Sequence, residues 1–279
     1  MRERRSWLVA AAAVALSAVA AVGVVAVRAQ PDEQAPKGTV VFSDEFEQDT
    51  LDPGRWTTCY WWDDKGCTNS GNDELEWYLP DNVSVADGVL RLEARRSPVR
   101  GSDGETYPYT SGMVTTGRSS DDRAEEPRFG FRFGHVEARM RMPEGKGLWP
   151  ALWMLPVSHD SRPEIDLMEV LGDSPSTLRA HFLYEDDGER VNRGHTWTGA
   201  DSTAGWHRYG LTWTPDELVW FVDGKEQWRY SDADHVPHEP MYLLIDLAVG
   251  GQWPGPPARS TQFPAVLEVD YVRVWQRDG

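Results

Sequence analysis

Residues 163–170 read Pro-Glu-Ile-Asp-Leu-Met-Glu-Val and place three carboxylates within six positions of an otherwise apolar segment. On a regular β-strand Glu164 and Asp166 share one face, whereas Glu169 lies an odd number of positions from Glu164 and points to the other face. One extra residue at Leu167-Met168, supplied by a β-bulge, would return Glu169 to the face of the other two acids. The segment therefore predicts a bulged strand with three acids on one side.

Three clustered acids suit acid–base chemistry. Like charges raise one another's proton affinity, so one carboxyl can stay ionised while another keeps its proton near neutral pH. Glycoside hydrolysis uses such a pair. From the spacing alone two other interpretations stay open, namely a solvated strand face and a set of carboxylates that holds a metal ion.

A tryptophan-rich segment, Gly145–Pro156, precedes the acids and carries Trp149, Ala151 and Trp153 at alternate positions of one strand face. The chain holds 14 Trp against 9 Tyr and 8 Phe, which is more indole than a core of this size needs. Indoles offer flat apolar surfaces on which sugar rings stack. Plain core packing is the alternative for either Trp, but beside the acids the pair predicts a carbohydrate cleft.

The rest of the chain is patterned as short strands. Segments expected to form strands are Val89–Ala94, His135–Met142, Leu218–Val222, Glu226–Tyr230, Met241–Val249 and Leu267–Trp275. The turn Asp223-Gly224-Lys225 between two of them is a strong hairpin signal. Outside the first 29 residues no window of about a dozen residues has convincing helical periodicity. The pattern predicts an all-β antiparallel sandwich.

Composition excludes several classes of protein. The 279 residues include 28 Lys or Arg and 45 Asp or Glu, giving a formal net charge of −17, which argues against a nucleic-acid partner. A hydrophobic content of 40% is enough for a core and argues against a disordered or fibrous chain. We expect a monomer.

The N-terminal segment, residues 1–29, is predicted to be an export signal. Its basic start precedes a 21-residue apolar run from Trp7 to Val27, and Val27 and Ala29 permit cleavage after Ala29. A run of this length could also span a bilayer, so an uncleaved anchor is the alternative and the only expected membrane contact. Residues 30–38 are predicted to be a short polar linker. The protein is therefore expected to be secreted.

The two cysteines, Cys59 and Cys67, are predicted to form a disulfide that closes a short loop, because an exported chain with a lone close pair most simply oxidises it. A cysteine-based metal site is disfavoured because it needs about four ligands. A catalytic thiol is weaker still.

A series of short motifs follows along the chain: Val41–Phe46, Asn72–Tyr78, Gly147–Met154, Glu164–Glu169, Trp213–Asp216, Val222–Gly224, Leu247–Gly255 and Val269–Val274. With them, residues 39–279 resemble the laminarinase-type members of glycoside hydrolase family 16. The resemblance implies a β-jelly-roll of two curved antiparallel sheets with a concave glycan cleft. It further implies a secreted, retaining endo-glycosidase that hydrolyses β-1,3 or mixed β-1,3/1,4 glucan. A non-catalytic glucan-binding module is the alternative from another class, and a transglycosylase or a hydrolase of another β-linked exopolysaccharide keeps the same chemistry.

The resemblance also implies catalytic roles. Glu164 would be the nucleophile, Glu169 the general acid and then base, and Asp166 the residue that tunes and orients both. A retaining pair must bring its carboxyl groups to about 5–5.5 Å. No cofactor would be needed for catalysis.

Further sites come from the same resemblance. The residues implied to bind substrate are Asn72, Glu74, Trp149, Trp153, His181 and Trp253. His181 would lie beside the acid/base, with a surface histidine in a structural hydrogen bond as the alternative. Gln252 stands where relatives commonly have Asn, which leaves the detail of that subsite open.

A structural calcium site is implied on the side away from catalysis, formed by the backbone carbonyls of Glu45 and Gly88 and the side chain of Asp270. Oxygen ligands from separate strands suit Ca²⁺. Asp270 could equally be a solvated edge charge.

Overall fold

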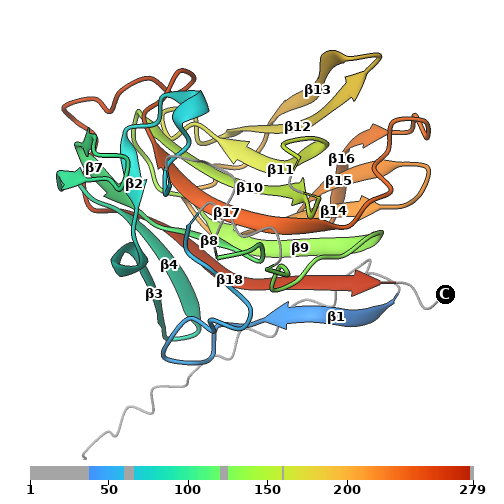
Figure 1. Ribbon diagram of the computed structural model, residues 1–279, viewed down its shortest axis with the longest axis horizontal. Coiled ribbons are helices and arrows are strands. Elements are labelled where there is room, and N and C mark those ends of the chain that lie inside the picture. Colours follow the sequence, from blue (N-terminus) through green and yellow to red (C-terminus); the bar gives the residue numbers. More distant parts are fainter. Residues whose placement is uncertain (1–37, 60–65, 120–124, 159, 277–279) are drawn as a thin grey trace, which may run out of the picture. The chain divides into compact units, whose positions relative to one another are not determined.

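The computed structural model describes residues 38–59, 66–119, 125–158 and 160–276 (Figure 1). The predicted export signal, the linker up to residue 37, and Trp61 and Trp62 of the disulfide loop lie outside the described residues. The chain divides into a unit of residues 1–32 and a unit of residues 33–279, and the description concerns the second unit. Within the described ranges no helix is long and apolar enough to cross a membrane.

Strands account for about half of the described residues. In chain order they are β1 (Thr39–Asp44), β2 (Glu76–Tyr78), β3 (Val83–Ala86), β4 (Val89–Ala94), β5 (Val99–Arg100), β6 (Thr106–Tyr107), β7 (Tyr109–Ser111), β8 (Met113–Thr115), β9 (Gly134–Arg141), β10 (Leu148–Pro156), β11 (Glu164–Val170), β12 (Thr177–Asp186), β13 (Glu189–Thr198), β14 (His207–Trp213), β15 (Leu218–Val222), β16 (Lys225–Tyr230), β17 (Met241–Val249) and β18 (Ala265–Gln276). Two single-turn 3₁₀ helices, η1 (Ser70–Asn72) and η2 (Pro80–Asn82), complete the described elements.

Two antiparallel sheets form the layers of a sandwich (Figure 1). The eight-stranded sheet has the order β16-β15-β14-β9-β18-β4-β3, with β1 also paired to β18. The six-stranded sheet has the order β13-β12-β11-β10-β17-β8. This confirms the predicted all-β jelly-roll of two curved sheets. One pair departs from the antiparallel expectation, because β2 and β7 run parallel in a separate two-stranded sheet.

The middle strands of the six-stranded sheet are buried on both faces. Along β17, Leu243 and Ile245 point into the core between the sheets, whereas Tyr242 and Leu244 join a smaller apolar cluster on the opposite face. Ala151 and other β10 residues belong to that second cluster. Because strand side chains alternate between faces, one run of apolar residues builds both the core and the floor on which the functional site rests.

The predicted strands agree with the structure to within two residues at each end, and β4, β15 and β17 have the predicted bounds. The predicted three-residue hairpin turn is in fact shorter. Lys225 already pairs with Val222, and only Asp223 and Gly224 form the turn, with φ of 50° and 76°. Two consecutive positive φ values define the tight turn whose twist matches that of the flanking strands.

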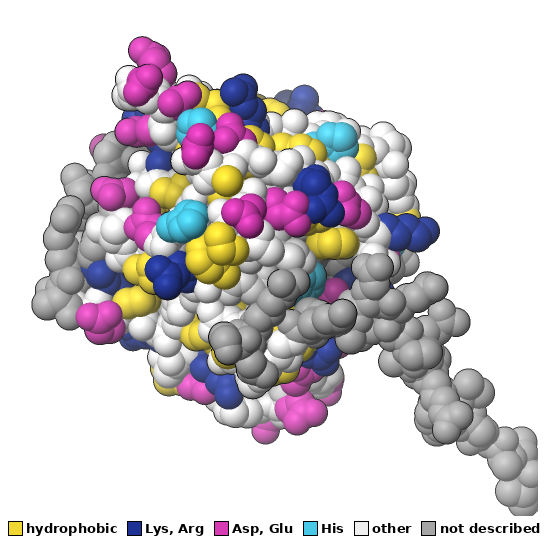
Figure 2. Space-filling model, turned by 90° about the vertical axis from the view of Figure 1, so that its right-hand side faces the viewer, with side chains coloured by type: hydrophobic (Ala, Val, Ile, Leu, Met, Phe, Trp, Pro, Cys, Tyr) yellow, Lys and Arg dark blue, Asp and Glu magenta, His cyan; other side chains and the backbone are white. Residues whose placement is uncertain are grey.

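Cys59 and Cys67 form the predicted disulfide. On the face of the molecule shown in Figure 2, acidic side chains are interspersed with Lys and Arg.

Candidate active site

A β-bulge in β11 brings the three acids of the opening motif onto one face. Asp166 lies opposite His181 of β12. Glu169 lies opposite Arg179, only two positions away along β12 but three along β11. On the other side β10 shows the same shift, and Leu167 is the residue without a partner. The structure therefore confirms the bulge predicted from the spacing of the acids.

The bulge is held from the opposite layer of the sandwich. Leu167 and Met168 are both buried in the core between the sheets. Trp220 of β15 donates its indole N–H to the backbone carbonyl of Asp166 at 2.9 Å. Trp220 is itself buried and stacked on Trp228, with ring centroids 4.1 Å apart. The Asp166 carbonyl at the bulge thus accepts a hydrogen bond from the other sheet, which avoids the cost of an unpaired buried polar group.

A cleft of about 500 Å³ lies on the face of the six-stranded sheet away from the core. Its lining includes every residue predicted to be catalytic or to bind substrate, namely Asn72, Glu74, Trp149, Trp153, Glu164, Asp166, Glu169, His181 and Trp253. These residues come from segments spread over some 180 positions of the chain, counting from 72 to 253. The fold therefore brings together one site from motifs that the sequence shows only separately.

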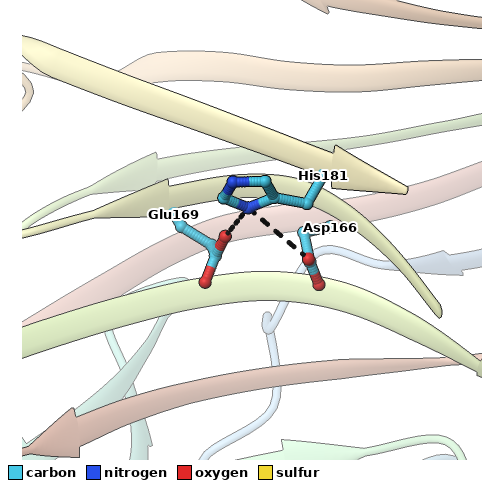
Figure 3. Close-up of side chains that lie close together, drawn as sticks. All are labelled: Asp166, Glu169 and His181. Carbon is cyan, nitrogen blue, oxygen red and sulfur yellow. Dashed lines mark hydrogen bonds and ion pairs between the residues drawn. The ribbon is translucent and has the colours of Figure 1, made fainter. Parts of the chain in front are cut away.

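Glu169 is held by two neighbours. His181 Nδ1 lies 2.5 Å from Glu169 Oε2 (Figure 3). Trp149 donates its indole N–H to Glu169 Oε1 at 3.1 Å. The same His181 nitrogen is 3.8 Å from Asp166 Oδ2. Both oxygens of Glu169 are therefore engaged, and the side chain has one defined orientation in the cleft.

Glu164 differs from Glu169 in this respect. It lines the cleft and is only partly buried, and within the described residues no hydrogen bond or ion pair engages its carboxyl group. A free carboxylate at the cleft surface can approach a bound molecule without first breaking a contact.

Burial and mutual repulsion raise the proton affinity of this cluster. The pKa of Asp166 lies well above its usual value, first because the carboxyl is buried and then because of the charges of Glu169 and Glu164. Burial and the charge of Glu169 also raise the pKa of Glu164 to about 7, against a lowering effect of Arg162. The cluster therefore carries fewer than three negative charges near neutral pH.

A metal ion is the alternative that the acid spacing left open. Ligand atoms of Asp166, Glu169 and His181 all lie within 4.8 Å of one another. However, the direct contact between His181 and Glu169 uses the atoms that a metal would need. In this arrangement His181 and Glu169 are hydrogen-bonding partners of each other.

A second group of acids, of which only Glu74 was singled out from the sequence, adjoins the first: Asp246 and Glu74 line the cleft, and the buried Glu76 lies next to Glu74. Asp246 of β17 accepts a hydrogen bond from the Trp153 indole at 2.6 Å and one from the Tyr78 hydroxyl at 3.2 Å. Burial and the charge of Glu74 raise its pKa well above the usual value. A lone Asp at an alternate position of an apolar strand was the available signal.

Glu74 and Glu76 complete this second group. Glu74 accepts a hydrogen bond from Asn72 at 3.0 Å, and burial together with the charge of Glu76 raises its pKa well above the usual value. Glu76 is fully buried, accepts the Val249 backbone N–H at 2.7 Å, and has a pKa raised to about 7 by burial. Of the two, only Glu74 had been predicted as a site residue.

The predicted tryptophans occupy different places in the cleft. Trp253 is 40% exposed, stands edge-on to Trp149 at 5.2 Å, and lies beneath the Arg179 guanidinium. Trp153 is only 8% exposed, so it forms floor rather than wall. Gln252 is not among the lining residues; its side chain donates to Asp73 in the neighbouring loop.

The residues proposed for calcium lie on the other sheet. Asp270 sits where β18 shifts register against β9 and accepts a hydrogen bond from Arg139 at 2.7 Å. Strand pairing brings Gly88, just before β4, and Glu45, just after β1, to neighbouring positions of the sheet. Asp270 Oδ1 makes no hydrogen bond within the described residues, so one ligand oxygen remains beside the ion pair.

Two curved antiparallel sheets with an acid-lined and tryptophan-lined cleft on one of them define a jelly-roll of the glycan-cleft type. The model of the glycosyl hydrolases family 16 matches residues 72–272. The chain belongs to this family.

Known relatives agree with this assignment. The chain is 36% identical over 255 residues to the endo-1,3-1,4-beta-glycanase EglC of Rhizobium meliloti, covering 86% of this chain and 52% of that protein. It is 34% identical to a beta-glucanase of Rhodothermus marinus, covering 88% and 87% of the two chains. The catalytic domain of a laminarinase from Thermotoga petrophila superposes with a TM-score of 0.76 at 32% identity, covering 88% of this chain and all of that one. The chain spans about half the length of the first of these relatives.

The raised pKa of Glu76 predicts how stability depends on pH. A carboxyl whose pKa is about 7 in the folded state and near 4.5 when unfolded binds its proton more tightly in the folded protein. Its contribution to stability is therefore full below about pH 4.5 and is lost as the pH rises to about 7. We expect Glu76→Gln to flatten the fall in melting temperature between pH 5 and pH 8 and to melt above the parent at pH 8.

Thermal melts at a series of pH values test this prediction, with the exposed Glu189→Gln as the matched control. If Glu76→Gln keeps the full pH dependence of the parent, the buried carboxyl is not its source.

Proposed function

We propose that this protein is an endo-acting β-glucanase that hydrolyses β-1,3 or mixed β-1,3/1,4 glucan with retention of anomeric configuration. The observation that carries the proposal is the pair of glutamates on one bulged strand. Glu164 presents an open carboxyl to the cleft, whereas Glu169 is held by His181 and Trp149. A retaining glycosidase needs this asymmetry, because one acid attacks and the other transfers a proton. The names of the relatives support β-glucan as the substrate class.

In the first step the Glu164 carboxylate attacks the anomeric carbon and the glycosidic C–O bond breaks. Glu169 gives its proton to the departing oxygen, which leaves as a hydroxyl. The products of this step are a glycosyl ester on Glu164 and a Glu169 carboxylate. The indole N–H of Trp149, together with His181 when Nδ1 carries its proton, donates hydrogen bonds to that carboxylate and stabilises it.

In the second step Glu169 takes a proton from water, and the water oxygen attacks the anomeric carbon. The ester bond breaks and Glu164 returns as a carboxylate, while Glu169 is protonated again. Each step inverts the anomeric centre, so the two together retain it. Asp166 between the two glutamates holds a proton more readily than a free Asp, which limits the repulsion that either ionised glutamate would feel.

The remaining cleft residues fit a sugar chain. Trp253 exposes an indole face for stacking against a sugar ring, and the polar groups of Asn72 and Glu74 line the same cleft for hydrogen bonds to hydroxyls. A cleft on the face of a sheet admits an internal segment of a polymer, which supports endo rather than exo cleavage.

We expect Glu164→Gln and Glu169→Gln each to lower kcat by roughly 10²–10⁴-fold or more while folding and glucan affinity change little, because Gln keeps the shape but neither attacks nor donates as an acid. The measurement is product analysis on laminarin, lichenan, cellulose, agarose and bacterial exopolysaccharides. The parent should release a series of oligosaccharides from laminarin or lichenan.

The exposed Glu189→Gln serves as the control and should match the parent. A Glu164→Gln protein with activity near that of the parent would refute the assignment of the nucleophile. Binding without any cleavage by the parent would favour a glucan-binding module, and transfer to acceptor sugars in place of release would favour a transglycosylase.

We also propose a structural calcium ion at Asp270 and the carbonyls of Glu45 and Gly88. An ion that binds only the folded state stabilises it by RT ln(1 + [L]/Kd), or about 2.7 kcal/mol at a hundredfold excess over Kd. Chelation should therefore lower the melting temperature of the parent but leave its activity below the transition unchanged. Asp270→Ala should lose the response to chelator, whereas Arg139→Gln should keep it. If chelator does not change the melting temperature of the parent, the proposed calcium site is contradicted.

A further inference from the structure

Gly194 lies directly beneath the histidine that contacts the acid/base. It pairs with His181 across β12 and β13. Asn192, two positions away on β13, lines the cleft, so Gly194 also belongs to the cleft face of this edge strand. No sequence motif pointed to Gly194, because its significance depends on the register between the two strands.

The histidine ring occupies the space that a side chain at position 194 would take. A Cβ placed on Gly194 would lie 2.5 Å from Cδ2 and 3.0 Å from Nε2 of His181. Carbon atoms in ordinary contact are about 3.5–4.0 Å apart, so an alanine at this position would force the imidazole to move. The backbone does not itself require glycine, since Gly194 is outside the left-handed region. The imidazole is therefore what the missing side chain accommodates.

The opposite edge of the same ring meets the catalytic acids. Nδ1 lies 2.5 Å from Glu169 and 3.8 Å from Asp166, and the Trp253 ring flanks the imidazole at 5.9 Å. A ring confined on one side by backbone and on the other by carboxylates has little freedom. Restoring ordinary carbon–carbon contact from 2.5 Å requires a shift of about 1 Å, and a shift of that size would weaken or break the short contact with Glu169.

We propose that Gly194 is a positioning residue for the acid/base: by carrying no side chain, it lets His181 lie against β13 with Nδ1 directed at Glu169. This inference rests on the proposed function of Glu169. Its consequence is that β13, which is separated from β11 by β12, determines the hydrogen bonding of the proton donor Glu169.

The charged groups that line the cleft with His181 come mainly from β11, which carries Glu164, Asp166 and Glu169. Arg162 precedes β11, Asp246 lies on β17 and Glu74 precedes β2, while Arg179 of β12 lies over Trp253 beside the ring. Beneath the ring β13 offers the backbone of Gly194, and the loop after β17 offers the uncharged Trp253. Displacing the ring toward or away from β13 therefore changes mainly its contact with the acids of β11, which makes the pH profile an informative measurement.

The experiment is a double-mutant cycle with Gly194→Ala, His181→Ala and the variant that carries both. We expect Gly194→Ala to lower kcat roughly 10-fold or more, as the loss of a charge-assisted hydrogen bond would. The basic limb of the pH profile should move by about half a pH unit or more. In the His181→Ala background the second substitution should change kcat by less than about twofold, since its steric partner is gone.

Gly199→Ala is the matched control, because Gly199 follows the same strand, has no positive φ, and a Cβ there would meet its nearest atom only at 4.0 Å. It should match the parent in kcat and melting temperature. If Gly194→Ala does not fold, the proposal requires that the variant with both substitutions does. The proposal is overturned by unchanged kcat and pH profile in Gly194→Ala, by an equal loss in the His181→Ala background, or by failure of both proteins to fold.

Nitrogen-15 NMR of the His181 ring separates this proposal from the proposed function. We expect the Nδ1 signal to differ between the parent and Gly194→Ala even if no glucan is cleaved, because the ring's hydrogen bond to Glu169 changes. If the parent is inactive on every glycan but the His181 signal still differs in Gly194→Ala, only the proposed function is contradicted. An active parent with an identical His181 signal in Gly194→Ala would contradict the role of Gly194 alone.

Discussion

The extra residue at Leu167 is the constraint on which the site depends. Without it, Glu169 would point into the core and β11 would present two acids to the cleft instead of three. The bulge is stabilised from outside the catalytic sheet, because the indole of Trp220 reaches through the sandwich to the carbonyl of Asp166. The two layers therefore contribute differently: the six-stranded sheet presents the acids, and the eight-stranded sheet fixes the backbone from which they project.

A second constraint is electrostatic. The cleft side of the sheet carries Glu164, Asp166 and Glu169. The buried acids Glu74 and Asp246 line the same cleft, and Glu76 is buried next to Glu74. Raised pKa values keep protons on part of this set near neutral pH, so the protein avoids the cost of many buried charges. The same protons are what acid catalysis requires. Stability and chemistry are thus linked through one group of carboxyls.

The sequence predicted the features that depend on local periodicity. The odd spacing between Glu164 and Glu169 indicated the bulge, alternation indicated β4, and short apolar runs, one of them beside the hairpin turn, indicated β17 and β15. Features that depend on register between distant segments were not accessible in this way. The roles of Gly194 and Asp246 depend on the residues that lie opposite them or near them on neighbouring strands. The amino-acid sequence alone does not specify this pairing. Trp153 was expected to bind substrate, and its hydrogen bond to Asp246, which holds it in the cleft floor, could not be predicted from the sequence.

The central claim is that the bulge places a nucleophile and a proton donor on one face, so that hydrolysis proceeds through a glycosyl–Glu164 intermediate. Proton NMR of the first reducing sugar released from a β-1,3-containing glucan tests it most directly. The account predicts the β-anomer as the initial product, followed by slow mutarotation to the equilibrium mixture. An initial α-anomer would mean single displacement by water, and would contradict the assignment of Glu164 as the attacking group.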